Sequence, residues 1–305
     1  MTPAPVAAWP FLKGHGAQND FLLLPDPHGR LRLLPEDVRQ LCDRRVGIGA
    51  DGLLRAVHTA TDPEAATMAE RATWFMDYRN PDGSPAQMCG NGIRVLARYL
   101  VDAGHQDPGT LAIATRAGIR HVHVPSRSPE FTGPVTVLMG RPALPGPAGI
   151  RVTVADRSWP ATHVDMGNPH AVAFVDDLDD AGDLRTPPTV TPADAYPAGV
   201  TVEFVAVRGP QHLAVRVHER GVGETRACGT GACAAVAGAL ARTGLRPAGP
   251  LRFAVDLPGG RLTITANPDG TMELIGPAAI VAQGTLNPTI RIPGPRIGWS
   301  PARAR

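Results

Sequence analysis

The sequence predicts an α+β fold made of two similar lobes, each rich in β-strands and built around one long helix. Three observations carry this prediction. Many short apolar runs are separated by Pro and Gly turns, as expected of strands. Only two long helical patterns occur, one in each half of the chain. Both follow the same Cys-Gly-x-Gly turn, at Cys89 and Cys228, and this spacing of almost half the chain indicates a duplicated unit.

Length and composition agree with a two-lobed globular protein. The chain has 305 residues, more than a single compact core usually needs. Hydrophobic residues make up 43% and charged residues 19%, which excludes wholesale disorder. The 30 basic and 28 acidic residues are scattered along the chain and leave a net charge of +2. This balance argues against nucleic acid and against a membrane surface as partners.

The two helices differ in their apolar pattern. In the segment after Cys89, apolar residues recur at helical spacing, and Arg94 and Arg98 stand on the other face, so we expect an amphipathic, half-buried helix. The helix after Cys228 is apolar all round, which suits a rod enclosed by sheet. The strands around them are predicted from the runs FLLLP, TWFMDYR, LAIATR, HVHVP, VTVLM, AVAFV, VEFVAV, LAVRVHE, LRFAVDL and RLTITA.

A proline-rich connection divides the chain. The segment RPALPGPAG, residues 141–149, predicts an N-terminal lobe of residues 1–141 and a C-terminal lobe of residues 142–272. The last residues, 287–305, are rich in Pro and Arg without periodicity and are expected to form a flexible tail.

The cysteines and the first residues predict a cytoplasmic protein. The start lacks the basic and apolar parts of a secretory signal, and the longest apolar run, residues 231–241, is too short to cross a bilayer. Four cysteines in such a chain do not form a disulfide framework and are expected to be reduced. We interpret Cys42 and Cys233 as small buried hydrophobic residues.

Cys89 and Cys228 have the chemistry that inversion of a carbon centre needs. A thiol at a helix N-terminus is favoured as thiolate by the helix dipole and by free N–H groups, so both are expected to ionise near neutrality. The same N–H groups form a cradle for a carboxylate. If both helix ends point into one cleft, a bound amino acid has its α-carbon between the sulfurs. One sulfur then removes the α-proton and the other reprotonates the opposite face.

Cofactor and metal sites find little support in the sequence. Pyridoxal phosphate needs a Schiff-base lysine, and the only lysine, Lys13, lacks a suitable setting. The Gly-rich string at residues 47–52 follows a helix-like segment where a dinucleotide site requires a strand. Neither Cys89 nor Cys228 has a second ligand at zinc-site spacing. We therefore expect no cofactor and no metal.

Seven motifs resemble the diaminopimelate epimerase family and occur in order from about residue 11 to 285. They are GHGAQNDF (14–21), GIGADG (47–52), YRNPDGS (78–84), MCGNG (88–92), MGNPHAV (166–172), ERGVGETRACGTGA (219–232) and DLPGG (256–260). The resemblance implies two barrel-like sheets, each wrapped around a central helix, with the active site in the cleft between the lobes. It also implies that a final strand near 273–286 returns to the first lobe.

The resemblance implies a role for individual residues. Cys228 would take the proton from the LL isomer of the amino-acid substrate and Cys89 would deliver one to give the meso product, a precursor of lysine and peptidoglycan. His170 and Glu219 would tune the thiols and orient the substrate. The implied substrate contacts are backbone N–H groups at Gly90, Asn91, Gly229 and Thr230, and side chains at Asn19, Asn80, Asn168, Thr201, Glu219 and Arg220. A homodimer is compatible with the resemblance.

Two departures from the family keep alternatives open. Thr201 stands where many members have Asn, and Gly52 where some have Gln. Both changes concern substrate choice, so a cofactor-independent racemase or epimerase of another amino acid remains an alternative. A redox or metal-binding dithiol protein is a more distant one, because two thiols in one cleft can also form a disulfide if their Cα atoms approach within about 7 Å.

Overall fold

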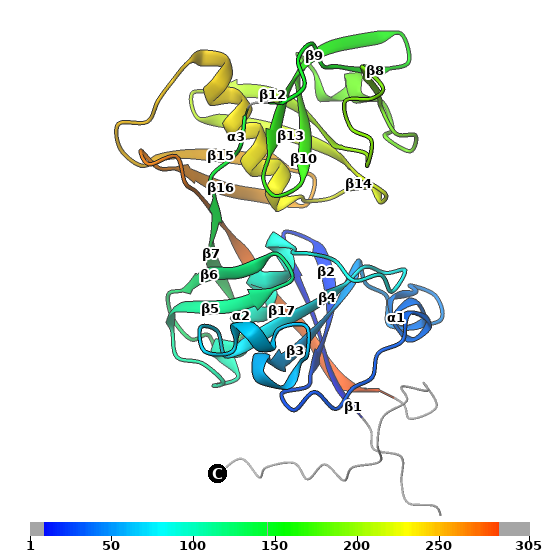
Figure 1. Ribbon diagram of the computed structural model, residues 1–305, viewed down its shortest axis with the longest axis vertical. Coiled ribbons are helices and arrows are strands. Elements are labelled where there is room, and N and C mark those ends of the chain that lie inside the picture. The colour runs from blue at the N-terminus through cyan, green and yellow to red at the C-terminus, as the bar shows by residue number, and fades with distance from the viewer. Residues whose placement is uncertain (1–8, 145, 287–305) are drawn as a thin grey trace, which may run out of the picture.

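The computed structural model describes residues 9–144 and 146–286, so the predicted tail at 287–305 lies outside the described residues. Figure 1 shows two lobes joined by two long strands. The first lobe holds β1 (Trp9–Gly16), β2 (Asn19–Pro25), α1 (Pro35–Cys42), β3 (Gly52–His58), β4 (Trp74–Arg79), α2 (Gly90–Asp102), β5 (Gly109–Thr115), β6 (Gly118–Val124) and β7 (Thr132–Gly140), with short 3₁₀ turns at Thr59–Thr61 and Ala66–Met68.

The second lobe repeats the plan of many strands around one helix. Its elements are β8 (Arg151–Val154), β9 (Arg157–Asp165), β10 (Pro169–Phe174), a 3₁₀ turn at Leu178–Ala181, β11 (Thr189–Thr191), β12 (Thr201–Gly209), β13 (His212–Glu219), β14 (Gly223–Thr225), α3 (Gly229–Thr243), β15 (Leu251–Leu257) and β16 (Gly260–Ala266). The last strand, β17 (Met272–Leu286), runs from this lobe into the first.

Strand β17 belongs to both lobes. Its first residues pair with β16, its middle pairs with β7, and its end pairs with β1, all antiparallel. From β1 the hydrogen-bonded order continues through β2, β3, β4, β5 and β6 back to β7, which closes the first sheet into an eight-stranded barrel. In the second lobe the order runs from β9 through β10, β12, β13, β15 and β16 to β17. The predicted α+β class is therefore confirmed.

Each of the two long helices is wrapped by the sheet of its own lobe. Helix α2 is buried along its whole length except at its last residue, which contradicts the expected half-buried helix. The prediction was wrong because Arg94 and Arg98, taken for a solvent face, both find polar partners inside the barrel: Arg98 pairs with Asp102, and Arg94 donates to Gly90 and Asn91. Helix α3 is buried over most of its length, as predicted. None of the helices in the described residues is long and apolar enough to span a membrane.

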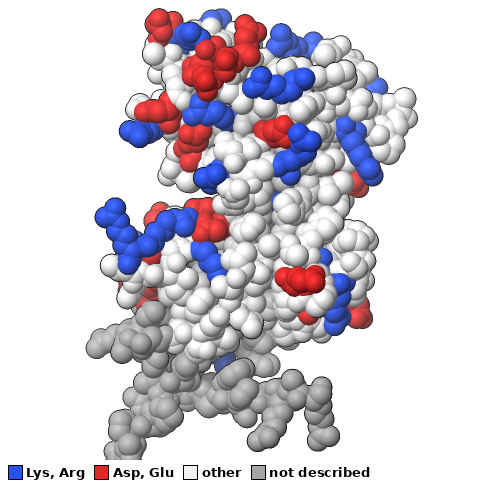
Figure 2. Space-filling model, turned by 180° about the vertical axis from the view of Figure 1, so that it is seen from behind, with Lys and Arg blue, Asp and Glu red and all other residues white. Residues whose placement is uncertain are grey.

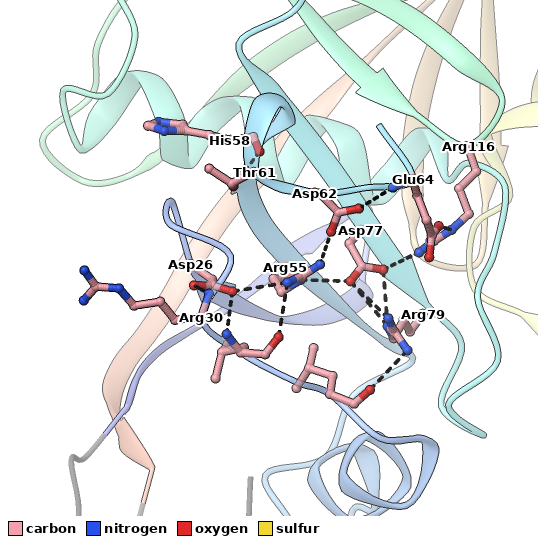
Figure 3. Close-up of polar contacts among 12 residues, drawn as sticks. Asp26, Arg30, Arg55, His58, Thr61, Asp62, Glu64, Asp77, Arg79 and Arg116 are labelled. Atoms are coloured by element: carbon pink, nitrogen blue, oxygen red, sulfur yellow. Dashed lines mark hydrogen bonds and ion pairs between the residues drawn. The ribbon is translucent and has the colours of Figure 1, made fainter. Parts of the chain in front are cut away.

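Charged residues of both signs are mixed on the surface, and several others form a buried network in the first lobe. On the face shown in Figure 2, Lys, Arg, Asp and Glu are interspersed without a large patch of one sign. In the first lobe, Arg55 of β3 is buried and bonds to Asp26, Asp62 and Asp77, and Asp77 also binds Arg79 and Arg116 (Figure 3). This network joins β3 and β4 to the loops that cover them.

Candidate active site

Both cysteines occupy the N-cap position of a long helix. Cys89 precedes α2, and its sulfur accepts the N–H of Gly92 at 3.4 Å. Cys228 precedes α3, and its sulfur accepts the N–H of Gly231 at 3.3 Å. The backbone of each cysteine is extended, as is usual for a residue that caps a helix. The two halves of the chain therefore present the same local structure, a sulfur at the positive end of a helix.

The first turns of α2 and α3 touch each other. A Cβ atom at Gly90 would lie 3.7 Å from the Cα of Gly229, and one at Gly229 would lie 3.5 Å from the Cα of Gly90. Backbone approaches backbone here because neither residue carries a side chain. The structure thus brings the two helix N-termini, each with its cysteine, to one place at the junction of the lobes.

Asn91 fastens these two turns together. Its Nδ2 donates to the carbonyl of Ala227 at 2.8 Å, directly before Cys228, and to Oδ1 of Asn19 at 3.0 Å. The same oxygen of Asn19 lies 3.9 Å from the sulfur of Cys89. The Nδ2 of Asn19 donates to Asp51 at 2.8 Å, which orients the amide. Of the predicted substrate ligands, Asn19 and Asn91 therefore lie at the cysteines, and the side chain of Asn91 has a linking role that the sequence did not suggest.

Burial makes both thiols weak acids. Burial raises the pKa of Cys89 to about 11, against the lowering effect of the Gly92 N–H, and the Glu219 carboxyl raises it further. Burial also raises the pKa of Cys228 well above its ordinary value, with added contributions from Glu219 and Glu203. These raised pKa values contradict the expectation that both thiols ionise near neutrality, because loss of hydration outweighs the effect of the helix N-terminus.

The carboxyl group of Glu219 affects the pKa of both thiols. It ends β13, and its carboxylate accepts the hydroxyl of Thr225. Burial raises its pKa, and its charge raises the pKa of both Cys89 and Cys228. The effect of one carboxyl group on both thiols supports one common site. Thr230, also predicted here, lies with its hydroxyl 3.4 Å from the sulfur of Cys228.

His170 is paired with a carboxylate that the sequence reasoning missed. The Nδ1 of His170, on β10, lies 2.6 Å from Oε1 of Glu203, on β12, and both side chains are fully buried. The second atom of each group, Nε2 of His170 and Oε2 of Glu203, is buried without a partner in the described structure. A carboxylate at the second position of the otherwise apolar run VEFVAV was the signal in the sequence.

The two departures from the family pattern have structural explanations. The hydroxyl of Thr201 is buried and accepts the backbone N–H of Arg220 at 3.3 Å, so it positions the residue predicted to hold the distal carboxylate. A Cβ atom at Gly52 would lie 2.7 Å from Cε2 of Tyr78 and 3.4 Å from its hydroxyl. The tyrosine ring therefore fills the space that a longer side chain at position 52 would need.

The remaining predicted ligands lie in turns around these residues. Asn80 follows β4, and its Nδ2 donates to Ser84 at 3.0 Å. Asn168 lies in the turn between β9 and β10, where its carbonyl accepts the N–H of Met166 at 3.1 Å. Arg220 is exposed and donates to the carbonyl of Ala198 at 3.2 Å. No hydrogen bond in the described part of the chain links these three side chains to either thiol.

The only lysine is paired with a carboxylate, and the described residues contain no cluster of metal-binding side chains. The amine of Lys13 forms an ion pair with Asp20 at 2.6 Å, so it is not a free amine in a pocket. Within residues 9–144 and 146–286, no three His, Cys, Asp or Glu side chains gather in a way that would hold a metal ion.

Solved structures of other proteins share this architecture. A phenazine biosynthesis protein of the PhzF family from Bacillus anthracis has a TM-score of 0.66 at 17% identity and covers 92% of this chain and 99% of that chain. A hydroxyproline epimerase from Agrobacterium vitis has a TM-score of 0.60 at 15% identity and covers 92% of both chains. At these identities the likeness shows the fold alone.

Sequence relatives are much closer. The family model described as diaminopimelate epimerase matches residues 11–145 and 162–281. A diaminopimelate epimerase of Streptomyces coelicolor is 58% identical over 280 residues, which cover 91% of this chain and 95% of that relative. One from Thermobifida fusca is 46% identical over 281 residues, or 90% of this chain and 97% of that relative.

Fold, site and relatives together define an enzyme of the isomerase class. Within that class, the chain belongs to the diaminopimelate epimerase family, as its seven motifs predicted.

Proposed function

We propose that this protein converts LL-diaminopimelate into meso-diaminopimelate without a cofactor, by proton transfer between Cys89 and Cys228. The observation that carries the proposal is the contact between two helix N-termini, each capped by a cysteine, at Gly90 and Gly229. A chain 58% identical to a diaminopimelate epimerase supports the choice of substrate. The product supplies lysine and peptidoglycan synthesis in this proposal.

The geometry supports a two-base mechanism. The N–H groups at Gly90 and Asn91, and at Gly229 and Thr230, donate hydrogen bonds to the carboxylate at the reacting carbon and stabilise the negative charge that develops there. Cys228 then removes the α-proton of the LL isomer from one face. Cys89 donates a proton to the other face, and the roles are exchanged in reverse.

Substrate binding would offset the raised proton affinity of the thiols. The carboxyl group of Glu219 raises the pKa of both thiols and so disfavours a thiolate. An amino acid brings an α-ammonium group, and a positive charge close to a thiol lowers its pKa. The thiolate is therefore formed when substrate is present, in a site from which water is excluded.

The residues around the cysteines would hold the substrate. Glu219 orients the α-ammonium group and His170 supports the thiols from the second lobe. Asn19, Asn80, Asn168 and Arg220 bind the distal ammonium and carboxylate groups, and Thr201 holds Arg220 in place through its backbone N–H.

Hydrogen exchange with solvent tests the proposal directly. Incubation of LL-diaminopimelate with the protein in deuterated water should place deuterium at one α-carbon of the meso product, detected by mass spectrometry. Recovery of unlabelled LL substrate as the sole species would refute the activity. A panel of other amino acids, assayed in parallel for loss of optical activity, tests the choice of substrate. Loss of optical activity with another amino acid would identify that amino acid as a substrate in place of diaminopimelate.

The predicted lobe boundary, location and assembly complete the proposal. β7 ends at Gly140 and β8 begins at Arg151, which supports a boundary near residues 141–142.

Cys42, Cys89, Cys228 and Cys233 are all free thiols, which supports a reducing compartment, the cytoplasm. We keep the homodimer as an expectation that the sedimentation velocity of the full chain can check.

A further inference from the structure

The side chain of Tyr78 extends from β4 to the end of β3. Tyr78 pairs with Leu54 of β3, and both side chains pack inside the first barrel. From this position the ring reaches two residues further along β3, because a Cβ atom at Gly52 would lie 2.7 Å from Cε2 of Tyr78 and 3.4 Å from its hydroxyl. Gly52 is the first residue of β3, so the hydroxyl lies where this strand begins.

The first turn of α2, which Cys89 caps, lies close to this ring. The rings of Tyr78 and Phe21 meet edge to face, with their centroids 6.0 Å apart. A Cβ atom at Gly92 would lie 3.5 Å from Cε1 of Phe21 and 3.5 Å from the Cβ of Cys89. One aromatic ring therefore separates Tyr78 from the turn whose N–H the sulfur of Cys89 accepts.

A second set of contacts connects the same place to Cys89. Asp51 directly precedes Gly52, and its carboxylate accepts the amide N–H of Asn19 at 2.8 Å. The oxygen of that amide lies 3.9 Å from the sulfur of Cys89. The Tyr78 hydroxyl at position 52 is thus tied to the active site from the strand ends as well as from the helix.

This hydroxyl has no hydrogen-bond partner within the described part of the chain. The hydrogen bonds of Tyr78 there use its backbone alone, although the side chain is half-buried and a tyrosine in such a place usually bonds through its hydroxyl. By contrast, the amide of Asn80, two residues further along the chain, already donates to Ser84 at 3.0 Å. Tyr78 therefore supplies an uncommitted donor beside a predicted substrate ligand.

The surroundings keep this hydroxyl protonated. Burial raises the pKa of Tyr78 well above its ordinary value of 10.0, and the neighbouring Cys89, Glu219 and Asp51 raise it further. A protonated phenol donates one hydrogen bond, and a carboxylate is the acceptor with which such a bond is strongest.

We propose that the Tyr78 hydroxyl donates a hydrogen bond to the distal carboxylate of the substrate and so selects an amino acid that carries a second carboxylate. This inference deepens the proposed function and rests on it. There, the helix N–H groups hold the carboxylate at the reacting carbon, which leaves the distal carboxylate for a donor on the barrel wall. Gly52 permits the contact, because a side chain at that position would displace the ring.

Tyr78→Phe tests the contact, because it removes the hydroxyl and keeps the ring against Phe21. The KM for LL-diaminopimelate should rise about tenfold, since a hydrogen bond to a charged group is lost. The kcat should stay within about twofold, because neither proton-transfer group has changed. A purely structural role would instead lower the melting temperature and kcat and leave KM unchanged.

Two inhibitors identify the group that the hydroxyl binds. α-Aminopimelate has the distal carboxylate without the distal ammonium, and lysine has the distal ammonium without the carboxylate. The inhibition constant of α-aminopimelate should rise about tenfold in Tyr78→Phe, and that of lysine should not change. A change for lysine in place of α-aminopimelate overturns the inference. If wild-type protein binds neither analogue measurably, the KM for LL-diaminopimelate decides.

Tyr99→Phe is the matched control. It removes a hydroxyl that bonds to His105 from the later turns of α2, and it should leave KM unchanged. Equal KM values in Tyr78→Phe and wild-type protein overturn this inference while the epimerase proposal stands. Absence of deuterium exchange in wild-type protein would refute the proposed function instead, and calorimetric titration of α-aminopimelate into wild-type protein and Tyr78→Phe would then decide the role of the hydroxyl.

Discussion

Sulfur atoms at Cys89 and Cys228 occupy a position where helices usually carry Ser, Thr, Asp or Asn. Each sulfur accepts one N–H of the first turn, so it serves as a cap as well as an acid or base. The capping bond favours the thiolate, whereas burial opposes it more strongly. The reactivity of each cysteine is therefore decided by its surroundings and not by its place on the helix.

Replacement of either cysteine should abolish epimerisation. Cys89→Ala and Cys228→Ala each remove one of two proton-transfer groups, and the loss of such a group lowers a rate by on the order of 10²–10⁴-fold or more. The rate of meso-diaminopimelate formation measures the effect, and circular dichroism checks that the fold remains. Cys42→Ala, at a buried cysteine in α1, is the control and should stay active. Substantial turnover in either active-site variant would contradict the two-base scheme.

Buried thiols should also make stability fall at alkaline pH. Burial raises the pKa of Cys42 to about 11, above its ordinary value of 9.0. The unfolded chain loses this proton first, so the stabilising contribution is complete below pH 9 and is lost as pH rises toward 11. Urea midpoints between pH 8 and 11 should decrease, and the slope should be smaller in Cys42→Ala. An equal slope in both proteins would show that Cys42 ionises without penalty.

Among the elements, β3 and β4 depend on a buried charge network as well as on apolar packing (Figure 3). Burial alone would raise the pKa of Asp77, but Arg79, Arg55 and Arg116 outweigh it and hold the pKa below its ordinary value of 3.8. The contribution of Asp77 to stability is therefore present above pH 3.8 and is lost as pH falls through the lowered value. We expect acid unfolding to begin in the first lobe.

Breaking this network should be costly. Arg55→Leu leaves Asp26, Asp62 and Asp77 without their shared cation, and loss of one partner from a buried ion pair costs about 3–5 kcal/mol. Urea unfolding measures the change in the free energy of unfolding. The control is Arg127→Ala, which removes an exposed pair with Asp107 and should cost about 1 kcal/mol or less. Similar losses in both variants would show that burial adds nothing to the network.

Viewed as a whole, the molecule depends on a few contacts that cross from one lobe to the other. The single strand β17 is part of both sheets, and the side chain of Asn91 donates a hydrogen bond to the carbonyl of Ala227. Because the site is assembled from both lobes, small changes at their junction affect activity as well as stability.

Asn91→Asp should separate the two helix ends. The substitution replaces a donor by an acceptor that faces two oxygens, on Asn19 and Ala227. An unsatisfied buried acceptor costs about 1–3 kcal/mol, and we expect at least a tenfold lower kcat from the displaced turns. Kinetics and urea unfolding measure both effects. Asn267→Asp, in the turn before β17, is the control; equal effects in both would deny Asn91 its linking role.

The sequence was sufficient for many of the strands, for both long helices with their starting cysteines and for the family, but the predicted runs did not include β1, β3, β8, β9, β11 or β14. These features follow from local pattern: apolar period, turn residues and short motifs that are contiguous in the chain. The resemblance to the family led us to expect Glu219 at the thiols, whereas it placed Asn19 at the distal groups of the substrate and the structure puts its side chain beside Cys89.

The tertiary structure alone decided the burial of Arg94, the pairing of His170 with Glu203 and the raised pKa of both thiols. None of these can be found in a local pattern, because solvent exposure and electrostatic environment are sums over neighbours that lie far apart in sequence. In the sequence, the helical spacing of Arg94 is typical of a surface residue. It is buried because the barrel around α2 is closed by β17, a strand that starts about 180 residues later along the chain.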